Sequence, residues 1–453
     1  MIIKHFYIQK IAHSSYILAG NKTCAVIDPA RDIEVYIKEA KKLDVAITHI
    51  LQTHLHADFI SGHMDLAQIT GAKIYAPAQG KSSFDHIALR EGDNIKLEDI
   101  KISVLETPGH TPEHISYIIN DLSRGDDPVA LFSGDTIFVG DVGRPDLFPD
   151  RAEDLAKELY DSIFNKLLKL PDYCEIYPAH GAGSLCGKSI GTKYTTTIGY
   201  EKTHSSILKV KDIEEFIKLL TVNMPEAPDH FSRNSAINSK GPTRLDQLKP
   251  LDSINCNNFL ELSKDPNYII VDVRSYHAFA GLHIPGSYCL DAFGNLPTFA
   301  GWVLPPQKNI LLVAETLSAL EDAVLWLRRV GLDNIAGYLK GGIHKWTTFG
   351  LPIKKLNQVS IDEFLDIYGS EDILLVDTRD KIAYESGHID GAINISTPEL
   401  RYRYKDLPKD RRIILICSAG LISSLGASIL LQNGFENIST IPGGMQAYNA
   451  RRQ

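Results

Sequence analysis

The sequence contains few cysteines and no excess of positive charge. Its six cysteines include no Cys-x-x-Cys pair and no spacing typical of a disulfide framework. We therefore expect a reducing, cytoplasmic setting in which any important cysteine works as a free thiol. Lysine and arginine together number 47 against 56 acidic residues, which gives a net charge of −9. This balance argues against a nucleic-acid partner, because no basic surface would attract phosphates.

Segments typical of secreted and membrane proteins are also missing. Residues 1–16 carry charges within an apolar stretch and have no small-residue cleavage site, so we expect a strand there rather than a signal peptide. The uncharged segment 413–432 is nearly long enough to cross a bilayer. Gly420 and several serines dilute it, however, and a buried strand followed by a helix explains it better. We expect no membrane partner.

The length of 453 residues is enough for roughly two to four domains, each with its own core. In residues 1–245, strand-like apolar runs alternate with helical stretches, beginning with a strand over 46–53 and a helix over 59–70. Later strands are expected at 100–107, 114–120, 130–136 and 175–180. Residues 225–250 are rich in proline, asparagine and serine and lack clear periodicity, which predicts a linker.

The remaining sequence contains an internal duplication. Residues 268–290 match 373–395, and residues 334–346 match 437–449. The pattern predicts two small α/β domains with parallel sheets, over residues 255–352 and 356–453. In this alignment Ala314 of the first copy stands where the second copy has Cys417. The second copy alone can therefore have a cysteine nucleophile at this position.

Polar residues with metal-binding side chains follow the expected strands of the first domain. The group consists of His54, His56, Asp58, His110, Asp135 and His180. Open α/β sheets place their ligand sites at the carboxyl ends of strands. A single histidine on a loop is usually only solvated, but six such groups, each after a strand-like run, predict a metal site. Phe59, next to Asp58, has no lone pair to offer a metal.

This order of motifs resembles the metallo-β-lactamase superfamily, whose pattern is His-x-His-x-Asp-His followed by His, Asp and His. The resemblance implies an αββα sandwich for the first domain, within an α/β multi-domain chain. Superfamily members commonly bind two ions, and the histidine of the Asp-His pair holds one of them. Phe59 stands at that position here. We therefore expect a site that holds a single ion.

Within the superfamily, residues 134–147 and 179–191 are similar to stretches of persulfide dioxygenases that are fused to rhodanese modules. This resemblance implies one Fe(II) per chain on a triad that leaves coordination positions open. The triad would be His54, His110 and Asp135. The groups that orient ligands and waters would then be His56, Asp58 and His180. The implied reaction oxidises a small persulfide, such as glutathione persulfide, with O2 to a thiol and sulfite.

Two alternatives remain open for the first domain. Three protein ligands and a water also describe a catalytic zinc site, so a zinc-dependent thioester hydrolase of the glyoxalase II type is possible. Its common binuclear form needs the histidine that Phe59 replaces, although the ligand types tolerate both metals. The other alternative is non-enzymatic, a sulfur carrier or interaction scaffold with Cys417 as the docking thiol.

Two further residues are candidates for substrate binding. Arg144 is a candidate anchor for an anionic substrate group, with a structural salt bridge as the alternative. Cys186, expected near the mouth of the pocket, is a candidate persulfide carrier, with a small packed residue as the alternative. Residues 182–189 match a permissive phosphate-loop pattern but lack the strand before it and the helix opening at the lysine, so nucleotide binding is not expected.

The repeated pattern of Val-Asp-x-Arg, Gly-His-Ile, Cys and Gly-Gly resembles the rhodanese family of sulfurtransferases. The resemblance implies that Cys417 handles sulfane sulfur, combining it with sulfite to give thiosulfate or running that step backward, and that the first copy is silent. Backbone N–H groups of the loop that begins at Cys417, and the N-terminus of the helix after it, should stabilise the Cys417 thiolate. The loop residues are Ser418, Gly420 and Ser423. Rhodaneses often have arginine at the positions of Ser418 and Ile422, so anion binding should be weaker here.

Asp377, Arg379 and His388 match rhodanese positions that are mainly structural, and we assign them no catalytic role. Relatives of this architecture form homo-oligomers, so a dimer or tetramer is expected from resemblance.

Overall fold

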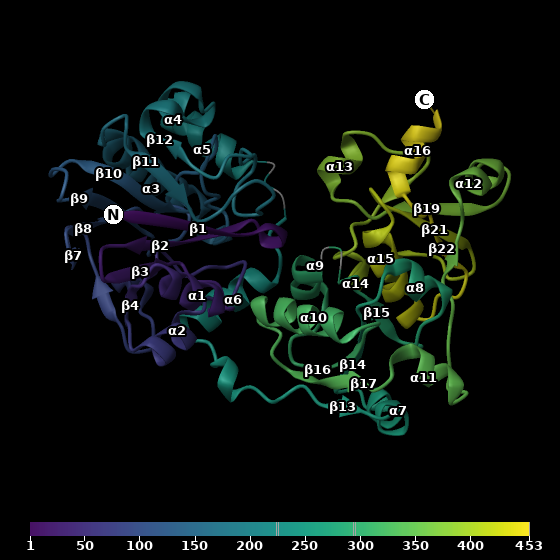
Figure 1. Ribbon diagram of the computed structural model, residues 1–453. Coiled ribbons are helices and arrows are strands. Elements are labelled where there is room, and N and C mark those ends of the chain that lie inside the picture. The colour runs from purple at the N-terminus through teal and green to yellow at the C-terminus, as the bar shows by residue number, and fades with distance from the viewer. Residues whose placement is uncertain (223, 225, 293, 295, 453) are drawn as a thin grey trace. The chain divides into compact units, whose positions relative to one another are not determined.

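The computed structural model describes residues 1–453 except 223, 225, 293, 295 and 453. The chain forms two compact units (Figure 1). The first unit comprises Met1–Leu248 with Arg329–Gly331, and the second comprises Lys249–Arg328 with Leu332–Gln453.

The first unit contains two six-stranded sheets. One has the order β1-β2-β3-β4-β5-β6, with the strands Ile2–Ile8, His13–Ala19, Thr23–Ile27, Ala46–Leu51, Lys73–Pro77 and Ile87–Leu89. The other has the order β12-β11-β10-β9-β8-β7. From β7 to β12, its strands are Asn94–Leu97, Ile100–Glu106, Ile115–Asp121, Pro128–Gly134, Glu175–Pro178 and Thr196–Thr197. The strands expected within 46–53, 100–107, 114–120, 130–136 and 175–180 are all present.

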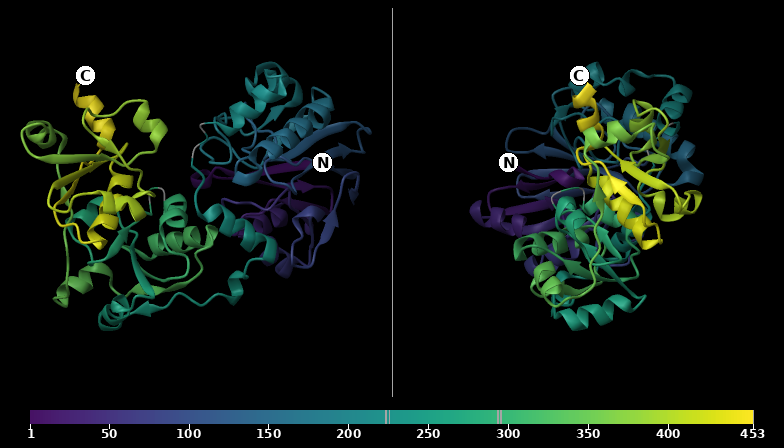
Figure 2. Two further views of the ribbon diagram at one scale, coloured as in Figure 1. Left: turned by 180° about the vertical axis from the view of Figure 1, so that it is seen from behind. Right: turned by 90° about the vertical axis from the view of Figure 1, so that its right-hand side faces the viewer.

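The two sheets lie face to face, with helices on their outer faces (Figure 1 and Figure 2). Alternating apolar residues of both sheets, such as Leu18 and Ile119, are buried in one core between them. Beyond the first sheet lie α1 (Glu34–Lys42) and α2 (His63–Thr70), and beyond the second lie α3 (Ala152–Asp161), α4 (Ile198–His204) and α5 (Ile213–Thr221). The expected αββα sandwich is confirmed.

The segment 225–250, expected to be a linker, contains a helix in its described residues. This helix, α6, spans His230–Lys240 and belongs to the first unit. Its residues Phe231, Asn234 and Asn238 are buried. No apolar periodicity marks this helix, because three of its four buried positions, His230, Asn234 and Asn238, are polar.

The second unit contains two five-stranded sheets of the same topology, with the orders β13-β17-β16-β14-β15 and β18-β22-β21-β19-β20. The first has the strands Ser253–Ile254, Tyr268–Asp272, Ser287–Cys289, Asn309–Val313 and Ile335–Leu339 (β13–β17). The second has Asn357–Gln358, Ile373–Asp377, Ile393–Asn394, Arg412–Ile416 and Ile438–Thr440 (β18–β22). All strand pairs in both are parallel, as the duplication predicts.

Helices connect these parallel strands. In the first copy they are α7 (Cys256–Lys264), α8 (Tyr276–Gly281), α9 (Leu296–Val303), α10 (Leu317–Arg329) and α11 (Gly342–Thr348). In the second they are α12 (Ile361–Ile367), α13 (Lys381–Glu385), α14 (Leu400–Arg403), α15 (Leu421–Gln432) and α16 (Gly444–Arg452). The uncharged segment 413–432 is strand β21 followed by α15. Within the described part of the chain, every helix is too short or too polar to span a bilayer.

Candidate metal centre

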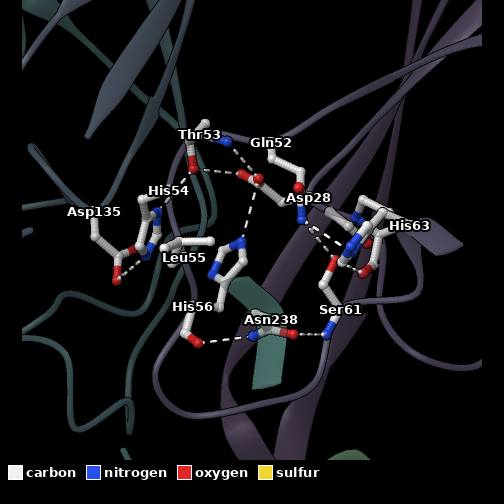
Figure 3. A network of polar contacts seen from close by, with 12 residues as sticks. Asp28, Gln52, Thr53, His54, Leu55, His56, Ser61, His63, Asp135 and Asn238 are labelled. Carbon is white, nitrogen blue, oxygen red and sulfur yellow. Dashed lines mark hydrogen bonds and ion pairs between the residues drawn. The ribbon is translucent and has the colours of Figure 1, made fainter. Parts of the chain in front are cut away.

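The loop that follows β4 carries His54 at the carboxyl end of the strand (Figure 3). The hydroxyl of Thr53 donates to Asp28 Oδ2 at 2.9 Å and lies 2.9 Å from His54 Nδ1. Because its only proton is used on Asp28, the hydroxyl must accept a hydrogen bond from Nδ1–H of His54. The Nε2 atom of His54 therefore carries the lone pair, and it lies 3.7 Å from Asp135 Oδ2.

His110 reaches the same carboxylate from the loop between β8 and β9. Its Nδ1 lies 2.9 Å from the carbonyl oxygen of Arg144, which can only accept, so Nδ1 donates. Its Nε2 lies 3.3 Å from Asp135 Oδ2 and has no hydrogen-bond partner among the described residues. Burial lowers the pKa of both His54 and His110, so both imidazoles are neutral ligands.

Asp135 follows β10 and is fully buried. Burial by itself would raise its pKa, but the charge and hydrogen bond of His180, together with His54 and His110, hold the pKa well below its usual value. The carboxylate is therefore ionised. One ligand atom from each of His54, His110 and Asp135 lies within 4.8 Å of the others. The two bare imidazole nitrogens beside a carboxylate fit a divalent ion.

His180, after β11, connects Asp135 to Asp58. Its Nδ1 lies 2.8 Å from Asp135 Oδ1, and its Nε2 lies 2.9 Å from Asp58 Oδ2. Burial would lower the pKa of His180, but the two carboxylates raise it well above the usual value. In this state His180 donates from both ring nitrogens and has no lone pair for an ion shared with Asp135.

Phe59 fills the position next to Asp58 and is fully buried. Its ring centroid lies 4.4 Å from that of His56 and 4.0 Å from that of His13. His56 turns its Nε2 toward Asp28 Oδ1, at 3.2 Å. Neither nitrogen of His13 has a hydrogen-bond partner among the described residues. The buried ring of Phe59 thus packs against two imidazoles.

The loop that follows β4, residues 54–61, is called the metal loop below. Asn238 of helix α6 contacts this loop (Figure 3). Asn238 Nδ2 donates to the carbonyl oxygens of His56 and Phe59, both at 2.8 Å, and Asn238 Oδ1 accepts from the backbone N–H of Ser61 at 3.0 Å. Because the residue is fully buried, these three hydrogen bonds fix the backbone between His56 and Ser61. Sequence reasoning missed this residue, since an asparagine in a polar segment carries no signal for a contact so distant along the chain.

Both candidate substrate residues are buried. Arg144 is buried and pairs with both carboxylate oxygens of Asp146, each at 2.7 Å, which is the structural alternative. Its role as an anion anchor stays a prediction. Cys186 is 1% exposed, and burial raises the pKa of its thiol to about 12. It is therefore an internal residue, close to Asp58 and His180, and not a group at a pocket mouth.

In the second unit, Cys417 directly follows β21 and is buried. The backbone N–H of Gly420 donates to its Sγ at 3.1 Å, and its Sγ lies 3.4 Å from Ser423 Oγ. Gly420 has φ +96°, which suits glycine, and it is the N-cap residue of α15. Ser418, by contrast, is exposed. This short loop brings one backbone donor to the sulfur, and the Cys417 thiol donates to the hydroxyl of Ser423, which itself donates to the carbonyl oxygen of Gly420.

The first copy places Ala314 directly after β16, as the second places Cys417 after β21. In the second copy, Arg379 pairs with Asp377 and donates to the carbonyl oxygen of Gly387. These contacts connect the end of β19 to the loop after α13. The other four cysteines, Cys24, Cys174, Cys256 and Cys289, are buried, as expected of core residues.

Known proteins agree with this arrangement. The model of the metallo-beta-lactamase superfamily matches residues 9–180, and that of the rhodanese-like domain matches residues 256–348 and 360–451. A crystal structure of a metallo-beta-lactamase from Staphylococcus aureus is 35% identical, with a TM-score of 0.67, and the match covers 74% of this chain and 98% of that one. The chain belongs to the metallo-β-lactamase superfamily. It also carries two rhodanese-like domains.

The relatives of the first domain include a persulfide dioxygenase and hydroxyacylglutathione hydrolases. A mitochondrial persulfide dioxygenase from Mus musculus is 28% identical over 234 residues, which cover 50% of this chain and 83% of that protein. A hydroxyacylglutathione hydrolase from Pseudomonas entomophila is 34% identical over 161 residues, which cover 36% of this chain. The match spans only 58% of that hydrolase. Both groups are compatible with a metal-dependent enzyme of this superfamily.

Proposed function

We propose that the first domain is a persulfide dioxygenase that holds one Fe(II) on His54, His110 and Asp135. The observation that carries this proposal is the convergence of two unprotonated Nε2 atoms on one carboxylate, next to a phenyl ring at the position of a further ligand. Two histidines and one carboxylate leave coordination positions open for both O2 and a sulfur anion. Such an ion supplies the redox chemistry that joins dioxygen to sulfur.

The protein side chains then have separate tasks. Thr53 and the carbonyl of Arg144 hold the two histidines in the tautomer that presents Nε2. His180 keeps Asp135 ionised and oriented through its Nδ1. Phe59 excludes water on one side of the site. The net reaction is R–S–S⁻ + O2 + H2O giving R–SH + HSO3⁻, in which sulfur is oxidised and dioxygen is reduced.

We infer that Cys417 handles the sulfane sulfur. As a persulfide, its outer sulfur can be attacked by sulfite, so that the Cys417 S–S bond breaks and thiosulfate and the free thiol are formed. The reverse reaction uses the same atoms. A shared chain raises the effective concentration of sulfite near the second active site. Small persulfides, thiols and sulfite are thus the expected partners, and dimer or tetramer formation stays a prediction that light scattering can test.

The competing function is zinc-dependent thioester hydrolysis, which the identity to hydroxyacylglutathione hydrolases favours. Two measurements distinguish these functions. The first is metal analysis after anaerobic purification, and the second is oxygen uptake with glutathione persulfide. We expect iron and persulfide-dependent oxygen uptake. Zinc together with thioester cleavage would instead establish the hydrolase. Intact protein with neither metal nor activity would favour a scaffold role.

His110→Ala tests the ligand assignment. Removing one of three ligands should abolish iron binding and lower oxygen uptake to background. His49→Ala, which removes a half-exposed histidine of β4 that lies outside the centre, is the matched control and should keep both properties. Iron retention by His110→Ala would refute the proposed triad.

A further inference from the structure

The two rhodanese-like copies belong to one compact unit and contact each other. Helix α15, which follows the Cys417 loop, packs against β15 and α8 of the first copy. The buried hydroxyl of Ser428 in this helix accepts a hydrogen bond from the backbone N–H of Cys289 at 3.1 Å. Arg401 donates to the carbonyl oxygen of Trp302 at 2.6 Å. The copy without a cysteine nucleophile therefore lies directly beside the copy that has one.

Tyr276 of the first copy reaches the Cys417 loop. It is the first residue of α8, and its backbone N–H donates to Asp291 Oδ2 at 3.1 Å. A Cβ atom at Gly420 would lie 3.1 Å from Tyr276 Cε2 and 3.3 Å from the Tyr276 hydroxyl oxygen. The same Gly420 donates its backbone N–H to Cys417 Sγ. The phenol ring therefore lies against the backbone that holds the sulfur.

The hydroxyl of Tyr276 has a proton to donate at this place. Burial, followed by the negative charges of Cys417 and Asp291, raises the pKa of Tyr276, so the phenol is protonated at neutral pH. Its oxygen accepts a hydrogen bond from the backbone N–H of Gly443. This arrangement leaves the O–H proton for a further acceptor. Tyr276 is partly exposed, so solvent reaches this side chain.

The reaction proposed for Cys417 brings an oxyanion to the same loop. Sulfite attacks the outer sulfur of the persulfide, so that Cys417–S–SH + SO3²⁻ gives Cys417–S⁻ + HS–SO3⁻. The electron pair of sulfite forms the new S–S bond, and the electron pair of the broken bond stays on Sγ. The oxygens of the incoming sulfite carry negative charge, and they need hydrogen-bond donors when they leave water.

The Cys417 loop itself has no arginine for this purpose. Ser418 and Ile422 occupy the positions where rhodaneses often have one. The charge of Cys417 acts on Arg379, but this guanidinium is paired with Asp377. A donor from the first copy would therefore supply what the loop of the second copy lacks.

We propose that the first copy completes the sulfur-transfer site of the second, and that Tyr276 donates its O–H to an anionic oxygen of the sulfite that attacks the Cys417 persulfide. In the reverse direction, Tyr276 binds the sulfonate group of thiosulfate. This inference rests on the proposed handling of sulfane sulfur by Cys417. It makes Tyr276 a residue that selects oxyanion substrates, and it gives the copy with Ala314 a role that needs no nucleophile.

Single-turnover release of sulfur tests this role. The full-length chain is loaded with glutathione persulfide under anaerobic conditions, so that no sulfite forms, and small molecules are removed. Release is then followed with sulfite, as thiosulfate, and with dithiothreitol, as sulfide. Tyr276→Phe keeps the ring and removes only the hydroxyl. Because a hydrogen bond to a charged group is lost, the rate constant with sulfite should fall about tenfold or more. The rate constant with dithiothreitol, which has no anionic oxygen, should stay native.

Tyr338→Phe is the matched control, because Tyr338 is a partly buried tyrosine of the same copy in β17. In the sheet order, β16 and β14 separate this strand from β15. The Tyr338 variant should keep both native rates. A native sulfite rate in Tyr276→Phe would overturn the proposal, and so would an equal loss with both acceptors, since that result indicates packing alone. Thiosulfate release from loaded Cys417→Ser would instead refute the sulfur handling by Cys417, and this inference with it.

Discussion

The metal centre and the Cys417 loop are built in different ways. The centre takes its groups from the ends of β4, β8, β10 and β11, and α6 supports it from a distant part of the chain. The Cys417 loop places a sulfur, a backbone donor and a hydroxyl within one stretch, residues 417–423. A site made of one loop can be duplicated together with its domain, and the first copy has Ala314 at the position of Cys417. A site assembled from separated strands depends on the whole fold.

Cys417→Ser tests the independence of the two sites and should have the largest effect on sulfur transfer. Serine has no nucleophilic sulfur to carry sulfane sulfur, so thiosulfate formation from persulfide and sulfite should fall to background. Oxygen uptake with glutathione persulfide should continue. Unchanged thiosulfate formation would show that another group carries the sulfur.

Asn238→Ala tests how far the metal centre depends on remote support. It leaves three backbone groups of the metal loop without their partner, so we expect a loss of about 1–3 kcal/mol in the free energy of unfolding. Iron affinity should fall about tenfold, since groups that orient metal ligands affect binding on this scale. Chemical denaturation and iron titration measure the two effects.

The control for this variant is Asn94→Ala, which removes an exposed asparagine of the same unit. It should change neither quantity appreciably. If Asn238→Ala lowered stability but left iron affinity unchanged, α6 would be a structural element without influence on the centre.

Ala314→Cys in a Cys417→Ser background tests whether a cysteine alone restores the one-loop site. Only residues 315–316 separate position 314 from α10, whereas residues 418–420 separate Cys417 from α15. The first copy also has Glu315 next to the new thiol, and a negative charge opposes thiolate formation. We expect sulfur transfer to stay at background, as measured by thiosulfate formation. Recovery close to the native rate would show that the loop backbone contributes little.

Ser423→Ala should give the smallest effect. It removes one hydroxyl near the sulfur, whereas the backbone N–H of Gly420 remains. A hydrogen bond of this kind contributes about 1 kcal/mol, so sulfur transfer should slow about fivefold. Iodoacetamide modification of Cys417 should slow to a similar extent. A loss as large as that of Cys417→Ser would mean that the hydroxyl is essential.

Much of this architecture could be predicted from the sequence. Strand-like runs that end in His, Asp or Cys predicted the sheets and the positions of the candidate site residues at strand ends, and the duplication predicted two α/β domains of the same topology. The side chains of His54, His110 and Asp135 do converge. His54 follows β4, His110 lies in the loop after β8, and Asp135 follows β10. Local periodicity and strand ends carry this information.

Contacts that depend on distant parts of the chain could not be predicted. The contact of Asn238 with the metal loop joins residues about 180 positions apart, and nothing local marks a buried asparagine as a partner of that loop. Cys186 was a candidate either for the pocket mouth or for a packed position, and it is buried close to Asp58, which only the path of the loop after His180 determines.

The central claim, a single redox-active ion on His54, His110 and Asp135, is tested most directly by anomalous diffraction at the iron edge. Crystals should be grown anaerobically from protein that was purified without added zinc or cadmium. We predict one iron peak beside the two Nε2 atoms, with His180 still contacting Asp135 through Nδ1. Two iron ions bridged by Asp135, with His180 bound to one of them, would contradict the account.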